Sequence, residues 1–227
     1  CLLLMESDAL MSSQEESFKA DRDRPSVISD YKESIRYVRS SRGISAAILT
    51  IAIISTFGFP VVQQIIVFAE EVFEVSPFLF GLLGSAQGIG AVLAVPLVTG
   101  YVSFMKPSVQ QLIATVGYGF AVMIFALAPS YTVAFCSLGI LGIMHLISAS
   151  NLNSVVQLQV DEEMRGRVMA IYLVGVLGPA PFAGLAMGWL VSSFGPRLVV
   201  ALSGSILALL AVVLWLRGKF SDLNATN

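Results

Sequence analysis

Long apolar stretches, separated by short polar segments, make up most of the chain after Arg42. A membrane-spanning helix needs roughly 20 mostly apolar residues, because an α-helix rises about 1.5 Å per residue. Six stretches are long enough, and they cover residues 43–67, 78–101, 108–128, 131–156, 168–193 and 198–216. Short connections of this kind are typical of antiparallel neighbours in a helix bundle. The pattern therefore predicts an all-α protein, a polytopic membrane helix bundle with a six-helix transmembrane domain at residues 43–217.

Residues 1–42 precede the first span and have a polar composition. Within them four apolar residues recur at helical spacing, namely Ile28, Tyr31, Ile35 and Val38. Basic side chains flank this apolar stripe, which favours an amphipathic helix near residues 28–41 on the inner membrane surface. We therefore expect residues 1–42 to form a cytoplasmic central loop that contains this helix. A helix that binds a partner protein would show the same pattern.

The basic residues are unevenly divided between the two sides of the predicted bundle. If successive connections alternate between the sides, twelve of the 13 Lys and Arg residues share one side, and Arg197 alone lies on the other. Short loops rich in Lys and Arg stay in the cytoplasm. We therefore expect a multi-pass protein of the cell membrane (plasma or inner membrane), embedded in the lipid bilayer. Both ends of this segment should be cytoplasmic, with residues 218–227 as a cytoplasmic tail.

Composition and motifs exclude several other classes of protein. Charged residues make up 12% of the chain, against about 25% in a typical soluble domain. The basic residues flank the membrane and form no surface for nucleic acid. One histidine and two distant cysteines give no metal-ligand cluster, and the sequence has no phosphate-binding glycine loop followed by Lys-Ser or Lys-Thr. We expect no enzymatic activity, no cofactor, no bound metal and no nucleic-acid partner.

Uncharged polar residues lie within the predicted spans, whereas no Asp, Glu, Lys or Arg lies near the middle of any span. Such side chains need hydrogen-bond partners in hydrocarbon, so they should face the bundle interior or a cavity. The candidates for a substrate cavity are Gln63, Gln87, Tyr118, His145 and Asn151. His145 could titrate near neutral pH and sense a proton or a substrate. Alternatively, it could serve only as a hydrogen-bond partner for a neighbouring helix.

The fifth predicted span combines glycine and proline in the segment Gly178-Pro179-Ala-Pro181-Phe-Ala-Gly184. Proline removes a backbone donor and glycine removes side-chain bulk, so a helix of this composition can kink or flex. We expect Gly178, Pro179, Pro181 and Gly184 to let the helix bend where two parts of the protein rock against each other. Tight helix packing is a compatible interpretation of the same residues.

The connection before this span carries acidic residues followed closely by basic ones. Asp161 and Glu162 precede Arg165 and Arg167. The acidic side chains could accept hydrogen bonds at the start of the next helix. The arginines could form ion pairs with a neighbouring cytoplasmic loop that break when the protein changes state. These four residues are therefore candidates for a cytoplasmic gate, and a purely topogenic set of charges is the alternative.

Part of the sequence resembles a known transporter family. The connection from Gln157 to Tyr172, which contains Arg165-Gly166-Arg167, resembles the corresponding loop of major facilitator superfamily transporters, and the following Gly184-x-x-x-Gly188 strengthens the likeness. The branch that it resembles contains enterobactin exporters and macrolide efflux proteins. Over residues 28–217 the resemblance implies the carboxy-terminal half of a twelve-helix fold. It also implies ion-gradient-driven efflux, by proton antiport and alternating access, of an amphipathic small molecule bound near the midplane between two halves.

The chain begins with Cys1, and its first residues, Cys-Leu-Leu-Leu-Met, resemble the end of an earlier apolar span. We therefore expect an amino-terminal six-helix half to precede this segment and to be its partner. Three other interpretations stay open: a complete six-span channel, the membrane domain of an ATP-driven exporter, and an inactive truncated fragment. A channel would need a recurring polar ring, and the ATP-driven class would need longer cytoplasmic helical extensions. Neither feature is visible in the sequence.

Overall fold

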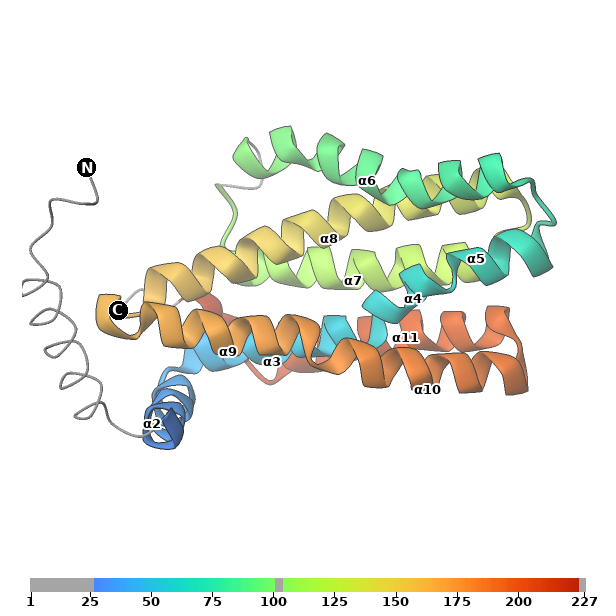
Figure 1. The fold of residues 1–227 in the computed structure, drawn as a ribbon. Helices are drawn as coiled ribbons and strands as arrows, with labels where there is room; N and C mark the ends of the chain where they lie inside the picture. Colours follow the sequence, from blue (N-terminus) through green and yellow to red (C-terminus); the bar gives the residue numbers. More distant parts are fainter. Residues whose placement is uncertain (1–26, 101–103, 225–227) are drawn as a thin grey trace, which may run out of the picture. The chain divides into compact units, whose positions relative to one another are not determined.

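The computed structural model describes residues 27–100 and 104–224, and this part of the chain contains helices and no strand (Figure 1). The predicted all-α class is therefore confirmed. Expectations that concern residues 1–26, 101–103 and 225–227 lie outside the described residues.

The described residues form ten α-helices and three shorter helical turns. The α-helices are α2 (Val27–Ser40), α3 (Arg42–Phe57), α4 (Phe59–Gln63), α5 (Ile65–Val67), α6 (Pro77–Thr99), α7 (Pro107–Ala126), α8 (Tyr131–Gln159), α9 (Arg165–Leu177), α10 (Pro179–Phe194) and α11 (Pro196–Leu216). Shorter helical turns are the π-helical η2 (Phe68–Val72) and the 3₁₀-helical η4 (Glu162–Met164) and η5 (Ser221–Asn224). Helix α2 forms where the sequence predicts an amphipathic helix, and its place on the membrane surface stays a prediction.

Six segments of the described chain are long and apolar enough to cross a membrane. They are Arg42–Val72, Pro77–Thr99, Pro107–Ala126, Tyr131–Gln159, Glu162–Phe194 and Pro196–Leu216. Each overlaps one of the six predicted spans. The chain thus has the architecture of a helical membrane bundle.

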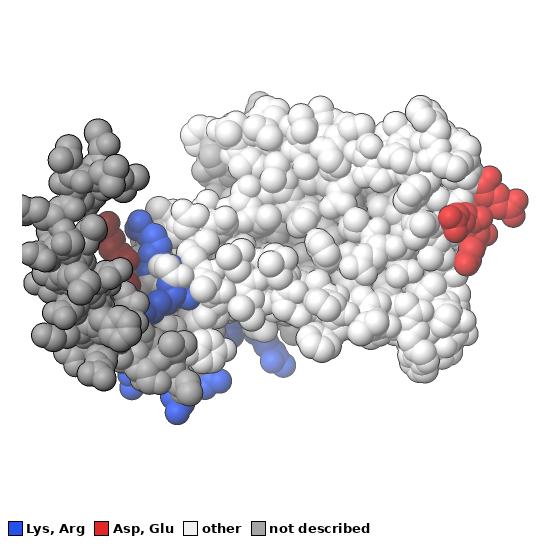
Figure 2. Space-filling view, in the orientation of Figure 1, with Lys and Arg blue, Asp and Glu red and all other residues white. Residues whose placement is uncertain are grey.

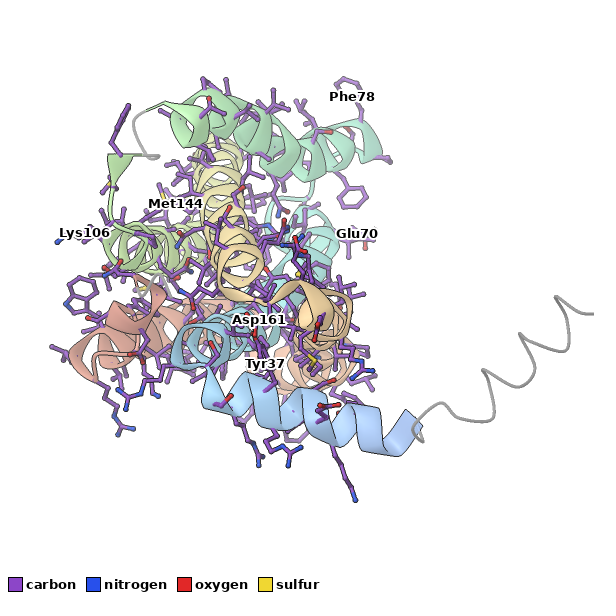
Figure 3. All side chains as sticks on the ribbon, turned by 90° about the vertical axis from the view of Figure 1, so that its left-hand side faces the viewer. Tyr37, Glu70, Phe78, Lys106, Met144 and Asp161 are labelled. Carbon is purple, nitrogen blue, oxygen red and sulfur yellow. The ribbon has the colours of Figure 1, made fainter. Side chains whose placement is uncertain are left out.

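Helices α7 and α8 make the most extensive contacts between the spans. Helix α8 contacts both α6 and α7, and α11 packs along α7 (Figures 1 and 3). Helix α3 contacts α8, α9, α10 and α11. The view in Figure 3 shows α6 at one edge of the bundle, where its main neighbour is α8. Much of α6 is consequently left exposed within this chain.

Close helix crossings in the bundle depend on a few glycines. An ideal Cβ on Gly142 of α8 would lie 2.0 Å from the backbone oxygen of Gln87 on α6, and one on Gly90 of α6 would lie 1.9 Å from the backbone oxygen of Gly139. Gly119 and Gly204 meet in the same way where α7 crosses α11. Small residues allow membrane helices to approach backbone to backbone, and these are the residues that do so here.

The first span is not the single continuous helix that the sequence predicts for residues 43–67. Helix α3 ends at Phe57, and the chain then forms α4, α5 and the π-helical turn η2. Gly58 and Pro60 explain the first break. Pro60 has no N–H to continue the helical ladder, and the amide of Val61 instead bonds the Gly58 oxygen, three residues back, at 3.2 Å. Figure 1 shows the change of direction between α3 and α4.

The fifth span is also divided into two helices. Helix α9 ends at Leu177 and α10 begins at Pro179, with Gly178 between them in a right-handed helical conformation. The amide of Gly178 still bonds the oxygen of Val174, at 2.8 Å. The interruption is therefore a kink in a continuous path, at the position that glycine and proline indicate.

The residues that follow the last span pack back against the bundle. Gly218 adopts a positive φ of 72°, which reverses the chain after α11 and is a conformation that glycine adopts readily. Phe220 and Leu223 are buried. The Asn224 carboxamide accepts a hydrogen bond from the Ser108 amide at 3.0 Å and donates one to the Ser108 hydroxyl at 2.8 Å, at the start of α7. Residues 218–224 of the expected tail are thus an ordered part of the bundle.

Candidate functional site

Three of the polar residues that the sequence singles out meet halfway along the spans. Gln87 lies near the middle of α6, Tyr118 near the middle of α7 and His145 near the middle of α8. The Gln87 Nε2 and His145 Nδ1 atoms are 3.4 Å apart. The Tyr118 and His145 rings make an edge contact, with centroids 5.8 Å apart and planes at 80°. We refer to Gln87, Tyr118 and His145 as the midplane polar cluster.

Glycines bring the members of this cluster together. Gly142 allows the backbone of α6 at Gln87 to contact α8 one turn before His145. Gly58, at the break between α3 and α4, lies under the Tyr118 ring: an ideal Cβ there would be 2.5 Å from a ring carbon. The polar cluster is therefore connected both to the α6–α8 crossing and to the break in the first span.

The hydrogen bond between Gln87 and His145 depends on which ring nitrogen of His145 carries a proton. An amide nitrogen can only donate a hydrogen bond, so the Gln87 Nε2 atom bonds His145 Nδ1 when that ring nitrogen carries no proton. A neutral ring with its proton on Nε2 satisfies this contact. If Nδ1 gained a proton, the Gln87 carboxamide would have to turn and present its oxygen. The pair therefore has two hydrogen-bonding arrangements that differ by one proton.

Gln63 and Asn151 lie outside this cluster. The Oε1 atom of Gln63, on α4, is 2.7 Å from the position that a Cβ on Gly184 would take, so Gly184 makes room for this side chain. Asn151 is buried. Its amide donates to the Pro107 carbonyl and to Gln111 Oε1, each at 3.0 Å. Asn151 therefore belongs to a separate network and is engaged in helix packing.

The centre of that network is Gln111, which the sequence reasoning missed. It is fully buried, and its Nε2 donates to the Thr115 hydroxyl at 2.9 Å and to the Ser148 hydroxyl at 2.6 Å. Together with Asn151, these side chains link α7 to α8. The spacing could have revealed them, because Gln111 and Thr115 are four residues apart on one helix face, and Ser148 and Asn151 are three apart on another.

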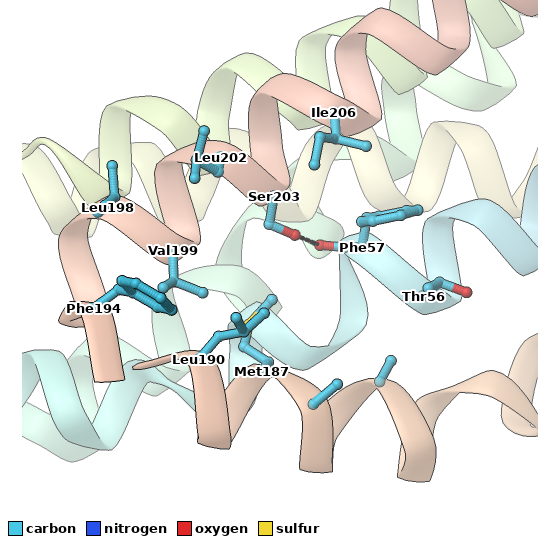
Figure 4. Close-up of a pocket in the computed structure, with 12 residues that line it drawn as sticks. Thr56, Phe57, Met187, Leu190, Phe194, Leu198, Val199, Leu202, Ser203 and Ile206 are labelled. Carbon is cyan, nitrogen blue, oxygen red and sulfur yellow. Dashed lines mark hydrogen bonds between the residues drawn. The ribbon is translucent and has the colours of Figure 1, made fainter. Parts of the chain in front are cut away.

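An apolar cavity lies beside the end of α3, where the first span is interrupted. It has a volume of about 450 Å³ and lies between α10, α11 and the end of α3 (Figure 4). Its lining residues are Thr56, Phe57, Ala183, Ala186, Met187, Leu190, Phe194, Leu198, Val199, Leu202, Ser203 and Ile206. The Ser203 hydroxyl donates to the Phe57 carbonyl at 2.6 Å within this cavity (Figure 4). The volume falls in the range of roughly 300–1,000 Å³ that is usual for small-molecule sites.

The four gate candidates lie in one exposed connection. Asp161, Glu162, Arg165 and Arg167 are exposed around η4 and the start of α9. The Asp161 side chain does not cap η4, and Met164 is the residue that precedes α9. Both the hydrogen bonding of these acidic side chains at the helix start and the gating role stay predictions.

The charged side chains of the bundle lie toward its two ends. Figure 2 shows a cluster of acidic side chains at one end, and Lys and Arg side chains with further acidic side chains among them toward the other. The acidic residues that are exposed after α5 are Glu70, Glu71 and Glu74. The span surface between the two ends shows no charged side chain in this view. This distribution suits a bundle that crosses a bilayer.

Comparisons with known proteins place these features in a wider context. A family model described as transmembrane secretion effector matches residues 4–227. The enterobactin exporter EntS of Salmonella choleraesuis (strain SC-B67) is 30% identical to this chain over 145 residues, which are 63% of this chain and 34% of that protein. The chain thus matches about one third of the length of this relative.

Proposed function

The chain belongs to the transmembrane secretion effector family of the major facilitator superfamily, and from this premise we propose that it exports an amphipathic small molecule by alternating access. Efflux is driven by an ion gradient, with protons as the exchanged ion. The protein acts as a transporter and carries out no enzymatic reaction. The observation that carries this proposal is the contact between Gln87 and His145 in the middle of otherwise apolar spans.

The substrate binds near the midplane, between this six-helix bundle and an amino-terminal six-helix half. Two features support an amphipathic substrate. The midplane polar cluster offers hydrogen-bonding groups, and the 450 Å³ cavity beside α10 and α11 offers an apolar lining. The break at Gly58 connects these regions, because Tyr118 packs on Gly58 and Phe57 lines the cavity.

Proton exchange uses the two arrangements of the Gln87–His145 pair. With a neutral ring, the Gln87 amide donates to Nδ1, and with a protonated ring the carboxamide turns and accepts. Histidine is suited to this role because its ordinary titration range lies near neutral pH. Binding of a proton thus changes the hydrogen bonds that the site presents to the substrate.

The first prediction concerns His145. The complete reading frame that encodes this chain is expressed in bacterial cells, and export of enterobactin and of ethidium (an amphipathic cation) is measured with imposed pH gradients. His145→Gln keeps a polar side chain but cannot be protonated near neutral pH. We expect export to fall at least about tenfold, equivalent to about 1.4 kcal/mol, and to lose its dependence on the pH gradient. Gln87→Ala should lower export in the same way.

The matched control is Gln157→Ala, because Gln157 is exposed on the same helix and is no part of the cluster. It should leave export unchanged. Wild-type pH dependence in His145→Gln would contradict proton exchange at this residue. Export of neither compound by the unmodified protein would contradict the proposed substrate class.

The second prediction concerns orientation. We propose an inner-membrane protein with α2 and the end of α11 on the cytoplasmic side, since basic connections stay inside. With Cys1 and Cys136 replaced by serine, Ser76→Cys should react with a membrane-impermeant maleimide in intact cells. Arg167→Cys should react only after the cells are permeabilised. The reverse pattern of labelling would overturn the orientation.

A further inference from the structure

Two serine hydroxyls bind backbone carbonyls at the two helix breaks. In the first break, the carbonyl of Phe57 would normally accept from the Val61 amide, but that amide bonds Gly58 instead. The Ser203 hydroxyl, from α11, donates to the Phe57 carbonyl at 2.6 Å (Figure 4). A carbonyl left out of the helical ladder in an apolar environment needs such a partner.

The second break has a corresponding arrangement. Pro179 and Pro181 offer no N–H to the carbonyls of Gly175 and Leu177, the two neighbours of Val176. The Ser55 hydroxyl, from α3, donates to the Val176 carbonyl. The donor is 121 residues away in the sequence, so this contact exists only because α3 and α9 lie side by side.

The two contacts share a short piece of α3. Ser55 donates to the second break, and Phe57, two residues later, accepts at the first break. Both serines are buried, with 4% and 5% of their surfaces exposed. The helices around them are in direct contact as well, since α10 packs against both α3 and α4. The end of α3 from Ser55 to Phe57 is therefore hydrogen-bonded to both breaks.

We propose that Ser55 and Ser203 are positioning residues that couple the breaks at Gly58 and Gly178, so that the first and fifth spans change their bend together. Through α3, the hydroxyls connect α11 to α9. Coupled bending would let the two spans move as one unit when the protein changes between its two open states. The role in transport rests on the proposed function, whereas the coupling itself does not.

The test measures amide hydrogen exchange by mass spectrometry on the complete protein purified in detergent. Ser203→Ala should raise exchange about threefold to tenfold, as loss of one hydroxyl–carbonyl hydrogen bond allows. The rise should occur both in residues 54–64 and in residues 174–183. Ser55→Ala should raise exchange in the same two segments. The double variant should exceed either single variant by less than the sum of their effects.

Matched controls exist on the same helices. The Ser205 hydroxyl bonds the Ala201 carbonyl of its own helix at 2.8 Å, and the Thr50 hydroxyl bonds the Ala46 carbonyl of its own helix at 2.7 Å. Ser205→Ala and Thr50→Val should leave exchange at both breaks unchanged. Ser203→Thr and Ser55→Thr keep a hydroxyl donor and should restore exchange toward the wild-type rate, which separates the hydrogen bond from a general loss of packing.

The coupling would be overturned if Ser203→Ala raised exchange only in residues 54–64, or if Ser205→Ala gave the same result as Ser203→Ala. Export kinetics supply the second measurement. Ser55→Ala should change kcat for the exported compound with little change in KM, because Ser55 is no part of the cavity lining and its hydroxyl acts on the helices. Absence of export would contradict the proposed function, and the exchange experiment would still decide the coupling.

Discussion

Replacing Gly142 with alanine is expected to separate α6 from α8 and to destabilise the bundle by about 1–3 kcal/mol or more, as overpacking does. The new Cβ would lie 2.0 Å from the Gln87 oxygen and 2.8 Å from its carbonyl carbon. Both atoms belong to backbone, so no side-chain rotation can relieve the clash. Because Gln87 must move away, the 3.4 Å contact with His145 should be lost as well.

The matched control for Gly142→Ala is Gly84→Ala on α6. Nothing lies within 4 Å of the Cβ that this substitution would add, and alanine favours a helix over glycine by roughly 0.5–1 kcal/mol. The midpoint of thermal unfolding in detergent should therefore fall for Gly142→Ala and stay equal or rise for Gly84→Ala. Equal midpoints for Gly142→Ala and wild type would show that the two backbones are not in contact.

Removing the Gln111 side chain should have the second largest effect. Gln111→Ala takes away the partner of Thr115, Ser148 and Asn151 at once. Hydrogen bonds between membrane helices contribute about 0.6 kcal/mol on average and up to about 1.7, and buried polar groups left without a partner cost more. We therefore expect a loss of about 2 kcal/mol or more in the free energy of unfolding.

The control for this substitution is the neighbouring residue. Gln110 is half-buried and takes no part in the network, so Gln110→Ala should change the unfolding free energy by less than about 0.5 kcal/mol. Chemical unfolding in mixed micelles measures both variants. If Gln111→Ala were no less stable than Gln110→Ala, the network would contribute nothing to helix packing. In Ser148→Ala, which loses one of these bonds, the effect should be intermediate.

The sequence predicts the helical class and the positions of the spans because the apolar stretches differ so clearly from the connections. It does not predict the break at Gly58, although Gly58 and Pro60 are both visible within the first span. Glycine and proline occur in several spans here, and Pro96 lies inside the single helix α6. Whether they interrupt a helix depends on partners such as Ser203, and the sequence does not reveal which helix lies opposite.

The candidate site, like the helix breaks, could be predicted from the sequence only in part. Gln87, Tyr118 and His145 could be selected individually, because each is a polar residue in the middle of an apolar span. Their meeting depends on how α6 and α8 cross, and Gly142 allows the close approach at Gln87. Gln111 lies near the start of α7, where polar residues are usual at a helix end, and so it did not stand out. Burial and hydrogen bonding distinguish it, and both are properties of the folded chain.

The packing of residues 218–224 has a consequence for biosynthesis. These residues leave the ribosome after all six spans, yet Asn224 completes the start of α7 and Leu223 accepts a hydrogen bond from Gln159 at the end of α8. The third and fourth spans of the chain therefore reach the membrane without their final partners. The ends of these spans that contact residues 218–224 are completed only when synthesis has passed the last span, which makes closure of the bundle a late, post-insertional step.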